Sequence, residues 1–113
     1  MMGVIMEDKR LFERFSARFP VKFRHARNDY GTDVFLRDAS AQGARILSKT
    51  KMFLNDSISL VVKLADGIHP LTLNGRVVWI KKAENEVWDV GVEFHKIDLM
   101  RTQRLYKMAN NLP

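Results

Sequence analysis

The sequence predicts an all-β domain, a small six-stranded antiparallel β-barrel with one C-terminal α-helix. Apolar and polar residues alternate along most of the chain, which is the period of a half-buried strand. Turn signals separate these runs at short intervals, at 28–31, 55–56, 66–67 and 84–85. Only the last segment has the apolar spacing of a helix. A series of short strands that ends in one helix is typical of a small barrel with a helix on its rim or side.

Six alternating runs are predicted as strands. In chain order they are 19–27 (FPVKFRHAR), 30–38 (YGTDVFLRD), 43–48 (GARILS), 56–64 (DSISLVVKL), 71–80 (LTLNGRVVWI) and 86–94 (EVWDVGVEF). In the fifth run, Leu71, Leu73, Val77 and Trp79 are expected to share a face, with Gly75 at a bulge or a close-packing point. The apolar residues expected to point outward are Leu47, Val61, Val78 and Ile80.

The helix is predicted to begin after Asp98, a good N-cap residue. Its expected apolar stripe consists of Leu99, Met100, Leu105, Met108 and Leu112. The chain length of 113 residues indicates one domain. Within it, residues 1–16 are expected to form a flexible basic N-terminal arm ahead of the first strand, and residues 17–113 the barrel and helix.

The composition indicates an anionic partner. The formal net charge is +6, and between Lys9 and Arg27 seven Lys or Arg residues stand against a single acid, Glu13. There are no cysteines, which excludes disulfides and cysteine-bound zinc. The start of the chain has no signal-peptide pattern, and no run is long enough to span a membrane. We therefore expect a soluble, cytoplasmic protein.

Two short motifs carry the residue types that bind anions and nucleobases. Arg10 and Arg14 form R-x-x-x-R, a spacing that places both guanidiniums on one side of the chain. Arginine binds phosphate or the edge of guanine with two parallel hydrogen bonds. Asp38, Ser40 and Gly43 form D-x-S-x-x-G after the second run, a carboxylate and a hydroxyl beside a glycine that permits an unusual backbone path.

Each motif alone also fits an ordinary structural role. Two arginines in so basic a chain can form a solvated face. Asp38 and Ser40 can make local backbone hydrogen bonds in a turn between strands.

Together, the motifs resemble those of the PilZ domain family. In this sequence Asp38 lies 24 positions after Arg14, and FPVKF follows the arginines as the first strand of the family does. WDVGVEF is similar to the family's last strand, and a closing helix follows. The resemblance covers roughly residues 8–111 and implies a PilZ-like barrel of the split-barrel type.

The resemblance implies a non-enzymatic receptor for the bacterial second messenger cyclic di-GMP, with no other cofactor. In such domains the arginine arm is flexible without ligand and wraps over the nucleotide. The implied ligand-binding residues are Arg10, Arg14, Asp38, Ser40, Gly43, Lys9 and Trp79. Lys9, just before the first motif arginine, points to two stacked ligands. Trp79 is implied as an aromatic contact to a purine, or else packs in the core or at its rim.

The ordering of the arm would signal to a downstream protein effector, in motility or biofilm regulation. The sequence does not name that effector. A motility motor, a pilus ATPase, a polysaccharide synthase and a regulator all remain open.

Three other functions are alternatives to this one. For an enzyme, the histidines His25, His69 and His95 have no metal-ligand spacing, and no nucleophile or phosphate-loop motif is present. A small barrel that binds single-stranded nucleic acid fits the charge, and would carry aromatics such as Phe35 and Trp79 along a groove. A PilZ-like adaptor without nucleotide is the third, with the outward apolar residues as its partner surface.

Overall fold

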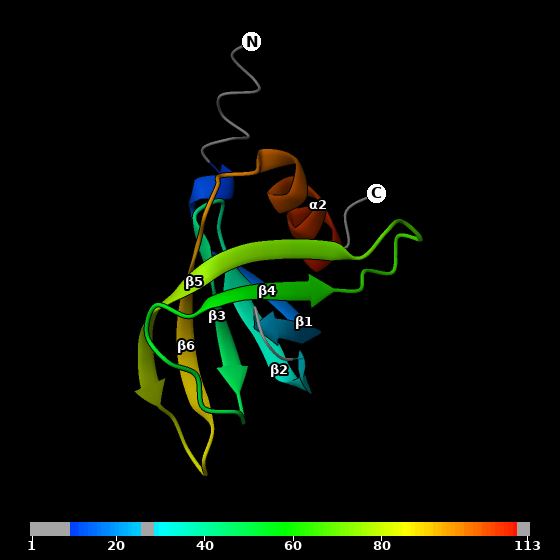
Figure 1. Cartoon of the computed structure of the whole chain (residues 1–113). Helices are drawn as coiled ribbons and strands as arrows, with labels where there is room; N and C mark the ends of the chain where they lie inside the picture. The colour runs from blue at the N-terminus through cyan, green and yellow to red at the C-terminus, as the bar shows by residue number, and fades with distance from the viewer. Residues whose placement is uncertain (1–9, 26–28, 111–113) are drawn as a thin grey trace.

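Six antiparallel strands close into a barrel in the computed structural model, which describes residues 10–25 and 29–110 (Figure 1). The elements are β1 (Phe15–His25), β2 (Asp29–Ala39), β3 (Gly43–Ser48), β4 (Ser57–Val62), β5 (Leu71–Lys82), β6 (Trp88–Phe94) and α2 (Leu99–Ala109). Around the barrel the order is β1-β2-β3-β6-β5-β4, and β4 pairs with β1 to close it. The predicted six-stranded barrel with a C-terminal helix is confirmed.

The core is formed by the inward residues of the alternating runs. Val34 and Leu36 on β2 and Leu60 and Val62 on β4 are fully buried, as the period of two predicts. Ile46 on β3 is buried equally well. The pattern therefore sets which face of each strand points inward, because a slip of one residue would expose the whole apolar set.

A bulge in β5 changes the predicted face of Trp79. Val77 pairs with Val92, but Trp79 pairs with Gly91 two residues further along β5 and only one residue back along β6. The extra residue reverses the alternation beyond it. Trp79 therefore points outward and is 37% exposed, so its expected place on the face of Leu71 is wrong. Ile80 instead packs against the core, which corrects its expected outward position.

The helix α2 begins where the sequence predicts. Asp98 is the N-cap, and its Oδ1 accepts a hydrogen bond from the Arg101 N–H at 3.0 Å. Leu105 is the most deeply buried residue of the helix and packs into the core. Met100 is 83% exposed, so its predicted place in the apolar stripe is wrong. Leu112 lies outside the described residues.

Two contacts hold α2 on the barrel. The ring of Tyr106 meets Phe15 of β1 edge-on, with centroids 5.1 Å apart. Arg104 donates from Nε and Nη2 to the two carboxylate oxygens of Asp66, at 2.7 and 2.9 Å, and so ties the helix to the β4–β5 connection. The hydrogen bonds from Arg104 are the largest cause that lowers the pKa of Asp66 from 3.8 to about 2.

Candidate functional site

The D-x-S-x-x-G residues form the tight turn between β2 and β3. The Ser40 N–H donates to the Gly43 carbonyl at 2.8 Å, and the Gln42 N–H donates to Ser40 Oγ at 3.2 Å. Ser40 thus makes the local backbone contacts expected of a turn. Within the described residues its hydroxyl proton has no acceptor, so this proton remains available to a ligand.

Gly43 is needed where β3 meets β6. It pairs with Glu93, and a Cβ added to it would lie 2.3 Å from the Val92 carbonyl oxygen. Among the described glycines only Gly67 has a positive φ, so Gly43 does not supply the unusual backbone conformation considered from the sequence. Its role in the structure is the close approach of two strands.

The last residues before β1 lie directly on this turn. Arg10–Phe12 are helical, and the Leu11 carbonyl accepts a hydrogen bond from the Ala41 N–H at 2.6 Å. Leu11 and Ala41 are both buried. This contact places the end of the R-x-x-x-R segment beside the D-x-S-x-x-G turn. Lys9 lies outside the described residues.

Asp38 lies between two guanidiniums. Arg14 donates to Asp38 Oδ1, and Arg45 Nε lies 2.9 Å from Asp38 Oδ2. The side chain of Asp38 is 18% exposed, whereas that of Arg14 is 58% exposed, so a largely buried carboxylate pairs with a solvent-exposed guanidinium. Arg10 is exposed at the edge of the same turn.

Arg45 and Asp89 are not among the residues predicted from the sequence. Arg45 also approaches Asp89 on β6, with a nitrogen 3.6 Å from Oδ2, and Asp89 Oδ1 is buried without a hydrogen-bond partner among the described residues. The burial of Ala44 and Ile46 on either side of Arg45 is the signal that it points outward. Its pairing with Asp38 follows from the register of β2 against β3, which the sequence does not give.

The strand registers bring Trp79 to the same face. Asp38 pairs with Arg45, Arg45 with Gly91, and Gly91 with Trp79, so these residues form one row across four strands. A Cβ on Gly91 would lie 2.0 Å from Trp79 Nε1, so the five-membered ring of the indole covers this glycine. With strands about 4.8 Å apart, Gly91 is roughly 10 Å from Asp38.

This outer face offers the groups that recognise a purine nucleotide. The carboxylate of Asp38 accepts from N–H pairs, and the Ser40 hydroxyl donates. A guanidinium is a chemical group that suits a phosphate, and Arg14 is exposed. The partly exposed indole of Trp79 has the flat surface that stacking requires.

The described residues hold neither a cluster of metal ligands nor a helix that could span a membrane. No group of three or more His, Cys, Asp or Glu is placed to hold a metal ion there. In the same part of the chain no helix is both long and apolar enough to cross a bilayer. His69 and His95 are exposed and far apart in the chain, in the β4–β5 and β6–α2 connections.

A family model described as PilZ domain matches residues 8–107. The chain belongs to the PilZ family. This match includes both motifs, Arg10 with Arg14 and Asp38 with Ser40 and Gly43. PilZ domains are binding and signalling domains rather than enzymes.

Solved structures support the same fold. The PilZ domain of CeSA from a cellulose-synthesizing bacterium is 19% identical, with a TM-score of 0.56 over 88% of this chain and 96% of that one. The Bacillus subtilis inhibitor of motility, MotI/DgrA, is 16% identical, with a TM-score of 0.61 over 87% of this PilZ domain. The match covers 48% of MotI/DgrA, so this PilZ domain spans about half the length of that protein. None of the curated proteins matches the chain.

Proposed function

We propose that this PilZ domain binds cyclic di-GMP and signals by ordering its N-terminal arm against the barrel; because β1 begins at Phe15, this arm is the part of the predicted segment 1–16 that precedes Phe15. The observation that carries the proposal is the position of Asp38. Its carboxylate lies between Arg14, just ahead of β1, and Arg45 of the barrel, beside the Ser40 turn and in one row with Trp79.

Asp38 provides the recognition of guanine. It accepts from the N–H pair on the Watson–Crick edge of that base, a pattern that adenine lacks. Arg45 Nε lies 2.9 Å from Asp38 Oδ2, so a cation of the barrel stands beside this carboxylate. Gly43 keeps the turn against β6 and so fixes the position of Ser40.

Arg10 and Arg14 bind the phosphates. Cyclic di-GMP carries two negative charges, and the exposed guanidinium of Arg14 exchanges its single carboxylate partner for a phosphate when the ligand arrives. Each charge-assisted hydrogen bond contributes about 1.5–3 kcal/mol, so several such bonds support micromolar binding after the cost of ordering the arm. The Lys9 ammonium next to Arg10 favours a second, stacked ligand.

The output of the domain is a change in the surface that a downstream protein contacts. A ligand that binds only the state in which the arm ahead of β1 is wrapped over it shifts the population toward that state. Leu47 and Val61 are half-buried outward apolar residues that remain for such a partner. A role in motility or biofilm control, and a cytoplasmic location, are part of this proposal.

The arrangement of the aromatics favours a nucleotide over a nucleic-acid strand. Phe35 is 46% exposed and Trp79 37% exposed, but they stand in different cross-strand rows. Those rows also hold Asp89 and Asp38, whose negative charges would repel the phosphates of a nucleic-acid strand lying along them.

Isothermal titration of the chain with cyclic di-GMP tests the proposal, with GTP and cyclic di-AMP as decoys. We expect saturable binding of cyclic di-GMP alone, and Arg14→Ala to weaken it by about tenfold or more, the loss of one charged hydrogen bond. Lys63→Ala removes a positive charge elsewhere on the barrel and should leave the affinity unchanged. A stoichiometry of two would support the role of Lys9.

The absence of saturable heat from a folded sample would reject the receptor. If Lys63→Ala lost as much affinity for cyclic di-GMP as Arg14→Ala, binding would depend only on net charge. That result would favour the nucleic-acid alternative.

A further inference from the structure

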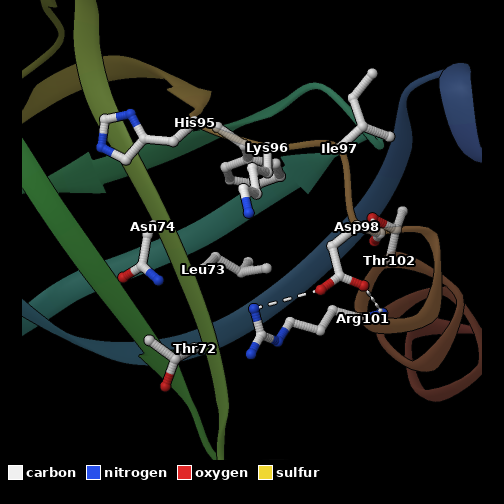
Figure 2. A pocket seen from close by; sticks show the side chains of 10 residues that line it. Thr72, Leu73, Asn74, His95, Lys96, Ile97, Asp98, Arg101 and Thr102 are labelled. Atoms are coloured by element: carbon white, nitrogen blue, oxygen red, sulfur yellow. Dashed lines mark hydrogen bonds and ion pairs between the residues drawn. The ribbon is translucent and has the colours of Figure 1, made fainter.

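A pocket of about 270 Å³ lies between β5, the β6–α2 connection and the start of α2 (Figure 2). Its lining shares no residue with the proposed nucleotide site. The lining residues are Thr72, Leu73, Asn74, Phe94, His95, Lys96, Ile97, Asp98, Arg101 and Thr102.

Lys96, Arg101 and Asn74 present hydrogen-bond donors to this pocket, whose polar lining also includes Thr72, His95, Asp98 and Thr102. Figure 2 shows the Lys96 ammonium and the Arg101 guanidinium approaching its centre from two different elements. The Ser59 hydroxyl donates to Asn74 Oδ1 at 2.6 Å. Because the Asn74 oxygen is occupied in this way, its amide nitrogen faces the pocket as a donor (Figure 2).

The charges in the pocket are not balanced. The single lining carboxylate, Asp98, accepts at the N-cap from the Arg101 N–H and lies 3.3 Å from Arg101 Nη1. Lys96 has no ion-pair partner among the described residues. One positive charge is therefore uncompensated beside an oriented amide donor, and this combination calls for an acceptor with negative charge.

Part of the remaining lining is apolar. Ile97 is 54% exposed, and Phe94 and Leu73 line the side toward the barrel. The pocket volume is near the lower end of the range for small-molecule sites. It is larger than a free phosphate ion needs. The site therefore suits a compact organic molecule with one anionic group.

We propose that this pocket is a second binding site, for a small organic anion whose phosphate or carboxylate meets Lys96, Arg101 and Asn74. Its apolar body rests on Ile97 and Phe94. The ligand bridges β5 and the connection that leads into α2, so its occupancy holds the helix N-terminus against the barrel.

Nuclear magnetic resonance of the uniformly ¹⁵N-labelled chain tests the site with defined probes. Phenyl phosphate and benzoate are the two anions with an apolar body, inorganic phosphate has none, and benzyl alcohol has no charge. We expect saturable shifts of the Asn74 side-chain amide and of the Ile97 and Thr102 backbone amides with the aromatic anions. Inorganic phosphate should bind more weakly, and benzyl alcohol should not shift these signals. The tighter of the two aromatic anions identifies the preferred anionic group.

Three variants locate the binding. Asn74→Asp still accepts from Ser59 but replaces the donor with a negative charge, and Lys96→Glu reverses the free cation; each should weaken the aromatic anions at least tenfold. Lys107→Glu makes the same charge change on an exposed position of α2 outside the pocket, and should bind as the wild type does. Both altered pocket residues are exposed, so the variants are expected to fold, and the amide spectrum verifies it.

Several results would overturn the proposal. The first is the absence of chemical-shift changes at Asn74 and Ile97. The second is binding of benzyl alcohol as tight as that of the aromatic anions. The third is a loss of affinity for the aromatic anions in Lys107→Glu as large as in Lys96→Glu. Shifts confined to Arg14 and Asp38 would assign the anion to the nucleotide site instead. Titration of Lys96→Glu with cyclic di-GMP keeps the two proposals apart, because that binding should be unchanged.

Discussion

Gly91→Ala should displace Trp79 from the barrel surface. The new Cβ would lie 2.0 Å from Trp79 Nε1, whereas ordinary contact begins near 3.4 Å. The indole must therefore move by about 1.4 Å, because the Gly91 backbone is held between β3 and β5. The ring is the mobile partner in this contact, since it is 37% exposed at the surface.

The cost in stability is set by the area the ring covers. A tryptophan buries about 150–250 Å², and with 37% exposed Trp79 removes on the order of 150 Å² from water, about 4 kcal/mol at about 25 cal/mol per Å². If the shift returns about a quarter of that area to water, unfolding free energy falls by about 1 kcal/mol. That corresponds to a decrease of about 4 °C in Tm for a domain of this size.

A double-mutant cycle with Trp79→Ala provides the assay, with urea unfolding as the readout. In the Trp79→Ala background the new methyl meets no ring, so Gly91→Ala should cost much less than in the wild type. The emission of Trp79, read in a Trp88→Phe background, should shift toward that of a solvated indole. Additive costs together with unchanged emission would refute the position of the ring on Gly91. Cyclic di-GMP affinity should fall in Gly91→Ala if Trp79 is the stacking surface.

Three further predictions follow from the fold. Gly43→Ala should cost more than Gly91→Ala in urea unfolding, since its Cβ would lie 2.3 Å from a backbone carbonyl that cannot rotate away; an equal cost would contradict the tight approach of β3 to β6. The pKa of Asp66 is lowered to about 2, so its pair with Arg104 stabilises the fold above pH 4 and loses that effect as the pH falls toward 2. The urea midpoints of wild type and Asp66→Asn should converge over that range, and a constant difference would count against the pair. Leu105→Ala should cost about 2–5 kcal/mol in thermal or urea unfolding, whereas Met100→Ala should be nearly neutral, because the first is 1% and the second 83% exposed.

Much of the local structure could be predicted from the residues alone. Alternation is a local property, so the inward faces of β2 and β4 follow from Val34, Leu36, Leu60 and Val62. The N-cap at Asp98 is also local, because its carboxylate reaches an amide three residues away. The two motifs are local as well, because each is defined by residue types at fixed spacing, and both lie within the part of the chain that the family model matches.

The wrong predictions of side-chain direction have two causes, a bulge that interrupts the alternation of a strand and the way the helix packs. A bulge adds one residue to β5 and reverses the faces of Trp79 and Ile80, and no residue in that run marks the position. Met100 matched the helical stripe, but the direction in which α2 packs against β1 leaves it in solvent.

The sequence by itself determined the all-β class, the order of the elements and the residues of both motifs. Only the tertiary structure decided that β6 pairs with β3 and β4 with β1, and therefore that Arg45, Gly91 and Trp79 extend the row that begins at Asp38. The pocket beside α2 also arises only when β5 meets the β6–α2 connection. The physical reason is range: propensity, capping and alternation act between near neighbours, whereas strand order and register are set by closing one barrel around one core.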